Sequence, residues 1–407
     1  MTALVDVGLY PELQQYGATD ISACFSCGNC TAICPLSEND ATFPRRMIRY
    51  AQVGMKDALL SSKELWSCYH CGECSESCPT QADPGELMAA ARRYAIASYD
   101  ATGIARLMVL RPILGIAFAL ALAVFFALVM AIGQGPQSTE TLAIFEFVPA
   151  ELIHDIGVVV MVLVFGAGLV GVARMARRIG RREGVGWGDL LGSRAALART
   201  GRALWSSLGR ESLGQARYRR ECESGVATAT SSAIATDRSS VAWYRRRWFI
   251  HAMVLWGFLG LLLATALDYA LDILGIKETG TPVPIWYPVR LLGTVAGIML
   301  VYGTTMMIID RVRGASRSVA RSGPADWTLL ALLWVTGMTG FVLELALYLP
   351  EAPAWGYWVF LVHVAVAMEL VLLAPFMKLA HAVYRPVALF FLALAREPRG
   401  ELERPQG

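Results

Sequence analysis

Eight of the nine cysteines stand near the amino terminus in two runs with identical spacing. Residues 24–35 read CFSCGNCTAICP, and residues 68–79 read CYHCGECSESCP. We call these runs the first and the second comb. Three thiols spaced two residues apart on one tight loop can bind one inorganic cluster together, while the fourth, held away by the turn before proline, reaches a different one. This pattern predicts iron–sulfur ligation.

The combs predict two 4Fe–4S clusters that exchange one ligand each. The spacing C-x2-C-x2-C-x3-C-P is the ligand run of two-cluster ferredoxins, in which the fourth cysteine serves the other cluster. Structural zinc is the alternative, but zinc sites favour paired C-x2-C knuckles over such triplets. The expected ligand sets are Cys24, Cys27, Cys30 with Cys78, and Cys68, Cys71, Cys74 with Cys34.

The ninth cysteine, Cys222, lies in a basic stretch and is interpreted as an idle thiol. The first twenty residues show neither a basic segment nor an apolar core, so they do not read as a secretory signal. We therefore expect the combs to face the cytoplasm, where thiols stay reduced and disulfides are rare.

Four of the five histidines, His154, His251, His363 and His381, fall in apolar spans, and the fifth, His70, lies inside the second comb. His363 and His381 are expected on one helix. Their separation equals five turns, so both would face the same way, roughly 27 Å apart. We predict two b-type haems, an inner one between His251 and His381 and an outer one between His154 and His363.

The composition is that of a membrane protein with a soluble portion. Hydrophobic residues make up 55% of the chain and charged residues only 17%, against about a quarter charged in ordinary soluble domains. Arginines concentrate in alternate loops, which predicts a multi-pass protein of the inner (cytoplasmic) membrane with both termini in the cytoplasm, rather than a nucleic-acid surface. Six spans are expected, near 107–133, 152–174, 247–275, 286–310, 326–349 and 357–384.

The predicted fold is all-α, a helical dicluster ferredoxin domain followed by a six-span transmembrane bundle. Ser61 with Glu64 predicts one capping box, and Asp83 before Pro84 predicts the start of another helix. The expected parts are a cytoplasmic ferredoxin domain (1–105), spans 1–2 (106–175), a basic cytoplasmic connection (176–246), haem-binding spans 3–6 (247–390) and a cytoplasmic tail (391–407).

Several stretches carry resemblances to known families. Residues 15–100, with FPRRMIRYAQVG and LWSCYHCGECSESCP, resemble the ferredoxin domain of the C-type subunit of heterodisulfide reductase. The last span, with its two histidines, resembles the gamma subunit of respiratory nitrate reductase. That family's partner helix carries both remaining ligands about ten residues apart, but here Leu261 stands at that offset from His251, so His154 is our proposed replacement.

The fusion of these modules, with YRRRWFIHAMVLWGFLGLLLAT, resembles the C-type subunit of the quinone-interacting membrane-bound oxidoreductase. More loosely, it resembles the protein that reoxidises flavin-dependent tricarballylate dehydrogenase. The resemblance implies two clusters, up to two b haems, quinone as substrate and cytoplasmic flavin partners. Arg247 and Arg290 are expected near haem propionates, and one of the membrane carboxylates, Asp155, Asp268, Asp272, Glu344 or Glu369, is expected to carry protons.

The sequence thus predicts an electron-transfer subunit of a quinone-dependent oxidoreductase complex rather than a complete enzyme. Its partner is expected to be a flavin and iron–sulfur protein resembling the A-type subunit of heterodisulfide reductase, since no flavin site is visible in the chain. Two alternatives stay open. One is a reoxidation protein for a dehydrogenase of the tricarballylate type, and the other is a non-catalytic membrane redox sensor or anchor.

Overall fold

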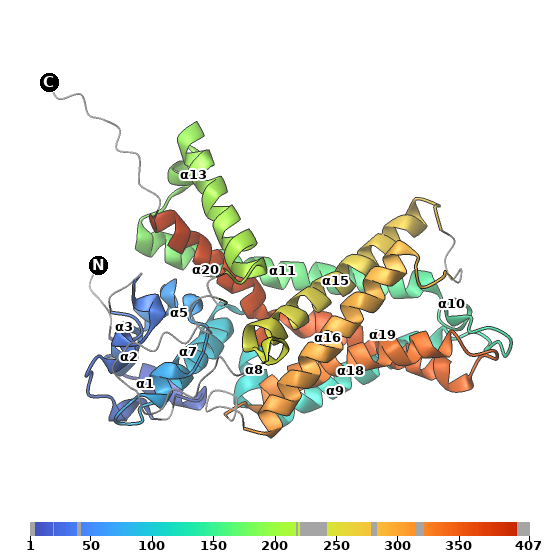
Figure 1. The fold of residues 1–407 in the computed structure, drawn as a ribbon, viewed down its shortest axis with the longest axis horizontal. Helices are drawn as coiled ribbons and strands as arrows, with labels where there is room; N and C mark the ends of the chain where they lie inside the picture. The colour runs from blue at the N-terminus through green and yellow to red at the C-terminus, as the bar shows by residue number, and fades with distance from the viewer. Residues whose placement is uncertain are drawn as a thin grey trace.

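The computed structural model describes residues 5–18, 20–38, 42–216, 219, 242–277, 283–314 and 321–396, and every regular element in these ranges is helical. Figure 1 shows short helices gathered at one end of the molecule and long helices extending away from them. The all-α fold, with an amino-terminal ferredoxin region and a bundle of apolar helices, is therefore confirmed. Cys222 lies outside the described residues.

The ferredoxin region consists of short helices packed on one longer helix, α7. Its elements are α1 (Leu9–Gln15), η1 (Ile21–Ala23), α2 (Asn29–Ala32), η2 (Pro35–Glu38), α3 (Arg45–Gln52), α4 (Lys56–Leu60), α5 (Glu64–Ser67), α6 (Glu73–Glu76), α7 (Pro84–Tyr99) and α8 (Ile104–Leu110). Leu9, Leu13, Met47 and Leu59 are fully buried in its core.

Asp83 begins α7 as predicted, because its carboxylate accepts the backbone N–H of Glu86 at 3.1 Å. The Ser75 hydroxyl donates to the same carboxylate oxygen and accepts the backbone N–H of Gly85 at 2.9 Å, which ties the second comb to α7. The predicted capping box at Ser61 is wrong. The Ser61 hydroxyl instead donates to the Asp57 carbonyl oxygen, and α5 begins at Glu64.

The apolar bundle is built from six long helices. They are α9 (Pro112–Ile132), α11 (Ala150–Glu183), α15 (Arg247–Ile273), α16 (Pro288–Val312), α18 (Pro324–Ala346) and α19 (Ala354–Leu373). Between or beyond them lie α10 (Ile144–Phe147), α12 (Trp187–Leu191), α13 (Arg194–Leu204), a π-helical extension (Trp205–Leu213) and the short η5 (Trp243–Arg245).

Small residues let α15 and α16 approach each other closely. A Cβ added at Gly257 would lie 2.5 Å from the backbone nitrogen of Leu300, and one at Gly303 would lie 2.9 Å from that of Val254. Without a hydrophobic driving force between helices in lipid, such close backbone packing is a main source of association. This hairpin fixes the position of His251 near the start of α15.

The sixth predicted span, 357–384, is not one helix. α19 ends at Leu373, and two short 3₁₀ turns, η6 (Ala374–Phe376) and η7 (Lys378–Ala380), lead into a separate helix, α20 (His381–Arg396). Pro375 lacks a backbone N–H and cannot continue the α-helical ladder, which explains the break. The prediction that His363 and His381 share one helix is therefore wrong.

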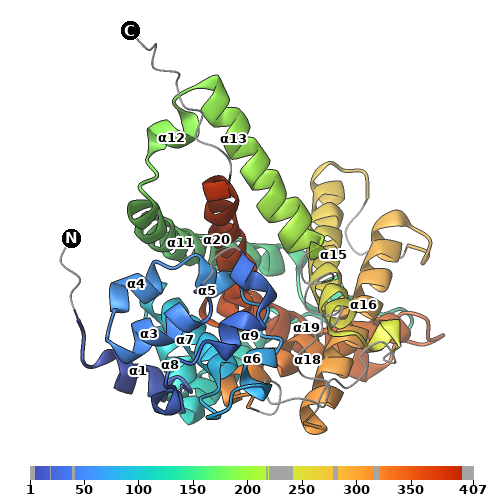
Figure 2. The same ribbon diagram turned by 60° about the vertical axis from the view of Figure 1, so that its left-hand side comes forward.

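In the part of the chain that the structure describes, seven helical segments are long and apolar enough to cross a membrane, counting Ala354–Phe376 and Lys378–Arg396 separately. The seventh, which contains α20, contacts α5 of the ferredoxin region and also α11, α13 and the π-helical extension. Figure 2 shows α20 beside α5, at the ferredoxin end of the bundle. A helix that packs on a polar domain in this way is better explained as a docking element than as a span, which leaves six long helices in the bundle.

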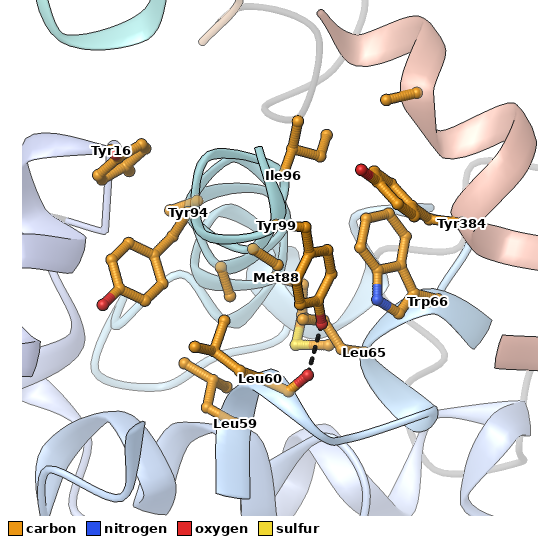
Figure 3. Close-up of a cluster of buried hydrophobic side chains, with 14 of the residues drawn as sticks. Tyr16, Leu59, Leu60, Leu65, Trp66, Met88, Tyr94, Ile96, Tyr99 and Tyr384 are labelled. Carbon is orange, nitrogen blue, oxygen red and sulfur yellow. Dashed lines mark hydrogen bonds between the residues drawn. The ribbon is translucent and has the colours of Figure 1, made fainter. Parts of the chain in front are cut away.

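An aromatic cluster joins α20 to the ferredoxin region. The Tyr384 ring lies 5.3 Å from the Trp66 ring and 5.4 Å from the Tyr99 ring, measured between centroids. Figure 3 shows these three side chains converging from α20, α5 and α7, with the Tyr99 hydroxyl donating to the Leu60 carbonyl oxygen. The ferredoxin region and the membrane bundle therefore share a packed interface.

Charged contacts strengthen this interface. Lys63 pairs with Glu183 at the end of α11, and the buried Asp326 of α18 lies 3.8 Å from Arg93 of α7 and 3.2 Å from Lys378. Removing one partner of such a pair would leave the buried Asp326 carboxylate uncompensated. These pairs connect the ferredoxin region to α11, α18 and Lys378.

Candidate cluster and histidine sites

The two combs adopt the same local conformation. Ser26 and His70, at equivalent positions, have φ angles of 64° and 57°, and the glycines that follow, Gly28 and Gly72, both have φ of 92°. Each glycine precedes a one-turn helix that carries the third cysteine. Positive φ values at these two nearby positions curl each loop tightly, so that its first three cysteines line one cavity.

Each comb contributes its fourth cysteine to the cavity of the other. One cavity is lined by the thiols of Cys24, Cys27, Cys30 and Cys78. The second is lined by those of Cys68, Cys71, Cys74 and Cys34. The Asn29 side chain donates to the Ser77 carbonyl oxygen at 2.7 Å and so connects the two combs. The structure therefore brings together the two crossed sets that the spacing predicts.

The thiols surround their cavities rather than meeting at a point. Among the described residues, no group of three or more His, Cys, Asp or Glu side chains converges on a position for a single metal ion. Burial, with the neighbouring Cys68 thiol adding to it, raises the pKa of Cys34 to about 12, and burial likewise raises the pKa of Cys74. Thiols in this setting ionise together only when bound iron offsets their charge, so the residues fit a 4Fe–4S cluster.

The second comb is held by arginines from three helices. Arg92 of α7 and Arg385 of α20 both donate to the Cys68 carbonyl oxygen, the latter at 3.2 Å, and Arg247 of α15 donates to the Cys71 carbonyl oxygen at 3.1 Å. The Arg385 guanidinium also stacks on the Tyr69 ring at 4.3 Å. The second comb therefore lies directly against the membrane helices.

The first comb lies further out. Cys27 is exposed, and the neighbouring Phe25 side chain is 65% exposed. The Arg45 side chain lines the same cavity and lies beside Gly28. The first comb can thus be approached by another protein, whereas the second comb faces the bundle.

His251 and His381 meet at the base of the second comb. Their ring centroids lie 6.0 Å apart, the rings inclined at 61°. The Nδ1 atom of His381 lies 2.6 Å from the Lys378 carbonyl oxygen, which can only accept, so Nδ1 carries the proton and Nε2 is left as a ligand atom. Histidines that ligate metals commonly donate their other N–H to a backbone carbonyl in this way.

His363 is similarly oriented, but it does not face its predicted partner. Its Nδ1 lies 2.9 Å from the Thr339 hydroxyl, which itself donates to the Val335 carbonyl oxygen at 2.7 Å, so Nδ1 donates and Nε2 stays available. The ring of His154 instead packs on the Tyr269 ring, with centroids 4.4 Å apart. Within the described residues, no ring contact joins His154 to His363.

His70 does not reach the histidine sites of the bundle. It lines the cavity of the second comb, and its backbone N–H donates to the Cys68 sulfur at 3.3 Å. Burial, with nearby Lys378 and Arg92, lowers its pKa to about 3, so the ring is neutral at physiological pH. Its position fits a packing role beside the second cavity.

The membrane carboxylates differ in their surroundings. Asp268 pairs with Lys277 at 2.6 Å, and Glu344 accepts the Thr294 hydroxyl at 2.9 Å and lies 3.7 Å from Arg290. Glu369 is 2% exposed, and its Oε1 atom has no hydrogen-bond partner among the described residues. An unpaired carboxylate in an apolar bundle is costly and therefore a functional candidate.

Sequence reasoning missed the roles of the arginines. The contact of Arg247 with the Cys71 carbonyl oxygen and that of Arg290 with the Val283 carbonyl oxygen were not anticipated, and their placement near haem propionates stays a prediction. Arg385 was not singled out. The signal was present in the spacing, because Arg247 and Arg385 each stand four residues from a candidate haem ligand and so share its helix face.

Comparisons with known families match both halves of the chain. Residues 20–82 match the model of the 4Fe–4S dicluster domain, and residues 187–401, more than half of the chain, match that of citrate utilization protein B. No solved structure matches.

The curated relatives likewise fall into two groups, one similar to the ferredoxin part and one to citrate utilization protein B. The C-type subunit of the H(2):CoB-CoM heterodisulfide,ferredoxin reductase of Methanothermobacter thermautotrophicus is 34% identical over 62 residues, which are 15% of this chain and 34% of the relative. Citrate utilization protein B of Escherichia coli is 28% identical over 153 residues, 37% of this chain and 38% of the relative. The chain spans about a third of the length of these relatives. It thus joins a ferredoxin like that of the C-type subunit of heterodisulfide reductase to a membrane redox domain.

Proposed function

The chain belongs to the citrate utilization protein B family, and from that premise we propose that it is a membrane electron-transfer subunit. It relays electrons between a cytoplasmic flavin or iron–sulfur partner and membrane quinone, through two 4Fe–4S clusters and two b haems. The single observation that supports this proposal best is the contact of the second comb with Arg247 and Arg385, one helical turn from His251 and His381.

The order of the sites follows from their exposure. The first comb is open to a partner at Cys27, the second comb lies between the first comb and the bundle, and the histidine pair lies beneath it. The crossed cysteines bring the two combs side by side, which keeps the step between clusters short. A bound cluster or haem takes up and gives back one electron at a time, at a potential set by its ligands and their hydrogen bonds.

The chain's own residues hold and tune these groups. His251 and His381 would hold the inner haem from opposite helices. His363 would hold the outer haem through Nε2, and His154 remains its proposed second ligand. Arg92, Arg247 and Arg385 place positive charge beside the second cluster and favour its reduced, more negative form.

We propose that the ferredoxin region and both termini lie in the cytoplasm and that α9, α11, α15, α16, α18 and α19 cross the inner membrane. The arginine-rich loops support this orientation, and an even number of crossings agrees with it. The proposed domain boundaries remain 1–105, 106–175, 176–246, 247–390 and 391–407.

The decisive experiment is purification from native membranes with partners retained, followed by iron, haem and subunit analysis. The proposal requires about eight iron atoms in clusters per chain, two b haems, and oxidation of the reduced haems by added quinone. Haems that stay reduced when quinone is added would instead support a redox sensor or anchor.

A second candidate is a reoxidation protein for a flavin-dependent dehydrogenase. The family match over residues 187–401 favours it, because that match lies in the membrane part, over α15, α16, α18 and α19, and outside the combs. The co-purified partner distinguishes the two candidates. A soluble flavin dehydrogenase supports the second, and proteins similar to the other subunits of heterodisulfide reductase support the first.

A further inference from the structure

An amphipathic helical arm projects from the ferredoxin end of the bundle. It consists of α12, α13 and the π-helical extension, residues 187–213. One face is formed by Ala203 and Ser207, both 1% exposed, together with their neighbours, and the arm packs through α13 and the extension on α20. The arm is therefore attached to the molecule along one side only.

A second side of the arm, about a quarter turn from the buried face, is apolar and uncovered. Leu197 and Leu204 are 49% and 44% exposed, and Leu208 and Trp205 are 46% and 71% exposed. Positions 197, 204 and 208 share one helix face, and position 205 adjoins it. Side chains of this size, placed in a row on a surface helix, mark a contact with another apolar phase.

The direction of the arm relative to the long helices indicates that this apolar partner is the lipid bilayer. Figure 1 shows α9, α11 and α19 running along the length of the molecule, and α13 running across that direction beside the ends of the bundle helices. Figure 2, from another side, shows α12 and the first part of α13 standing clear of the other helices. Helices that span a bilayer run across it from one surface to the other. A helix that crosses their direction at the ferredoxin end therefore runs parallel to the bilayer surface.

Basic residues lie at one edge of the apolar face and on the side of the helix away from it. Arg194, Arg202 and Arg210 are exposed, and α13 itself has no acidic residue. Helices that lie in the membrane interface combine Leu and Trp on one face with Lys and Arg on the other, because the apolar face enters the acyl boundary while the cations contact lipid phosphates. The Trp205 ring, with its polar N–H, also suits that interface.

We propose that residues 187–213 form an in-plane membrane helix that binds the anionic lipid of the cytoplasmic leaflet. This rests on the proposed cytoplasmic position of the ferredoxin region. Because the arm packs on α20, which carries His381 and Arg385, lipid binding would fix α20 and thereby the junction between the second comb and the inner histidine pair.

The test uses the full chain in its native membrane, with a photoreactive benzophenone amino acid placed at one position at a time. At Leu204 the probe is expected to form lipid adducts. At Ala195, exposed on the side of α13 that carries Arg202, it is expected to form few. A protein adduct at Leu204, or equal lipid yields at both positions, would overturn the proposal.

A probe at Val162, exposed on α11, separates this inference from the proposed function. Lipid adducts at Val162 without adducts at Leu204 contradict the arm alone, whereas their absence at both contradicts the membrane placement itself. In nanodiscs, adducts at Leu204 should rise several-fold when phosphatidylglycerol is added to phosphatidylcholine. The double variant Arg194→Gln with Arg202→Gln should lose that rise, and a rise that the variant retains would argue against charge recognition.

Discussion

His251 and His381 face each other across a ring-centroid distance of 6.0 Å, although His251 lies one turn inside α15 and His381 begins α20, far away in the sequence. Arg247, one turn before His251, and Arg385, one turn after His381, both donate to the backbone of the second comb. A single junction therefore joins the proposed second cluster to the proposed inner haem, and most of the testable consequences concern this junction.

Replacing His381 by Ala should remove one b haem and leave the other. The inner haem would lose an axial ligand, whereas His363 keeps its bond to Thr339 on α18. Haem per chain, measured by the pyridine haemochrome spectrum, should fall from about two to about one, in line with one haem for each ligand pair. His251→Ala should do the same. Loss of both haems in His381→Ala would contradict independent sites.

The crossed cysteines predict that the fourth thiol of each comb serves the other comb's cluster. Cys34→Ser should alter the cluster held by the second comb, and Cys78→Ser the one held by the first. The two clusters differ in surroundings, with three arginines beside the second, so their EPR signals should be separable in a redox titration. If Cys34→Ser removes the same signal as Cys24→Ser, the crossed assignment is wrong.

The combs were predictable from the sequence because their ligand spacing is local. Each triplet fits one tight loop, and the fixed turn before proline sends the fourth thiol away. The histidine arrangement was less predictable because it depends on a break between two helices. Pro375 signalled that break, yet apolar residues on both sides of it made one long span look continuous.

The contacts that hold the second comb could not be predicted. Arg92, Arg247 and Arg385 come from three distant segments, and all of them donate to backbone carbonyls rather than to side chains. Every residue carries a backbone carbonyl, so the type of the accepting residue does not indicate such a hydrogen bond. The position of His154 against Tyr269 likewise depends on how α11 and α15 pack, which periodicity alone does not specify.

Arg385→Gln should lower the midpoint potential of the second cluster. The guanidinium stabilises the reduced, more negative cluster, so its loss favours the oxidised form. We expect a fall of tens of millivolts, where about 59 mV equals a tenfold change in equilibrium constant for a one-electron couple. EPR-monitored titration measures it. Arg385→Lys, which keeps the charge but loses the stacking on Tyr69, should retain most of the potential, and an equal fall in both variants would exclude a role for charge.

Gly257→Leu should destabilise the α15–α16 hairpin and lower the amount of inner haem bound per chain. Its Cβ would lie 2.5 Å from the Leu300 nitrogen and 2.8 Å from the Ala296 carbonyl oxygen, so backbone must move. Overpacking of this kind costs about 1–3 kcal/mol or more. Gly166→Leu is the matched control, because no atom lies within 4 Å of the added Cβ there. Thermal unfolding in detergent and haem content should change in the first variant only.

Glu369→Gln should slow quinone-linked oxidation while leaving both clusters and both haems in place. The side chain is 2% exposed with Oε1 unpartnered, so an ionised carboxylate is costly there and a proton is held readily. Gln keeps the shape and polarity but cannot take up or release a proton. Because positioned acid–base groups contribute about 100-fold or more, turnover with quinone analogues as electron acceptors should fall by at least about tenfold.

Asp268→Asn is the control for this experiment, because Asp268 already pairs with Lys277 and its side chain is 47% exposed. It should retain turnover close to that of the unaltered chain. Haem reduction by dithionite bypasses proton uptake, so it should be equal in all three proteins and shows that the cofactors are intact. If Glu369→Gln turns over quinone at the unaltered rate, the proton passes through another group, and Glu344 with its Arg290 partner becomes the residue to replace next.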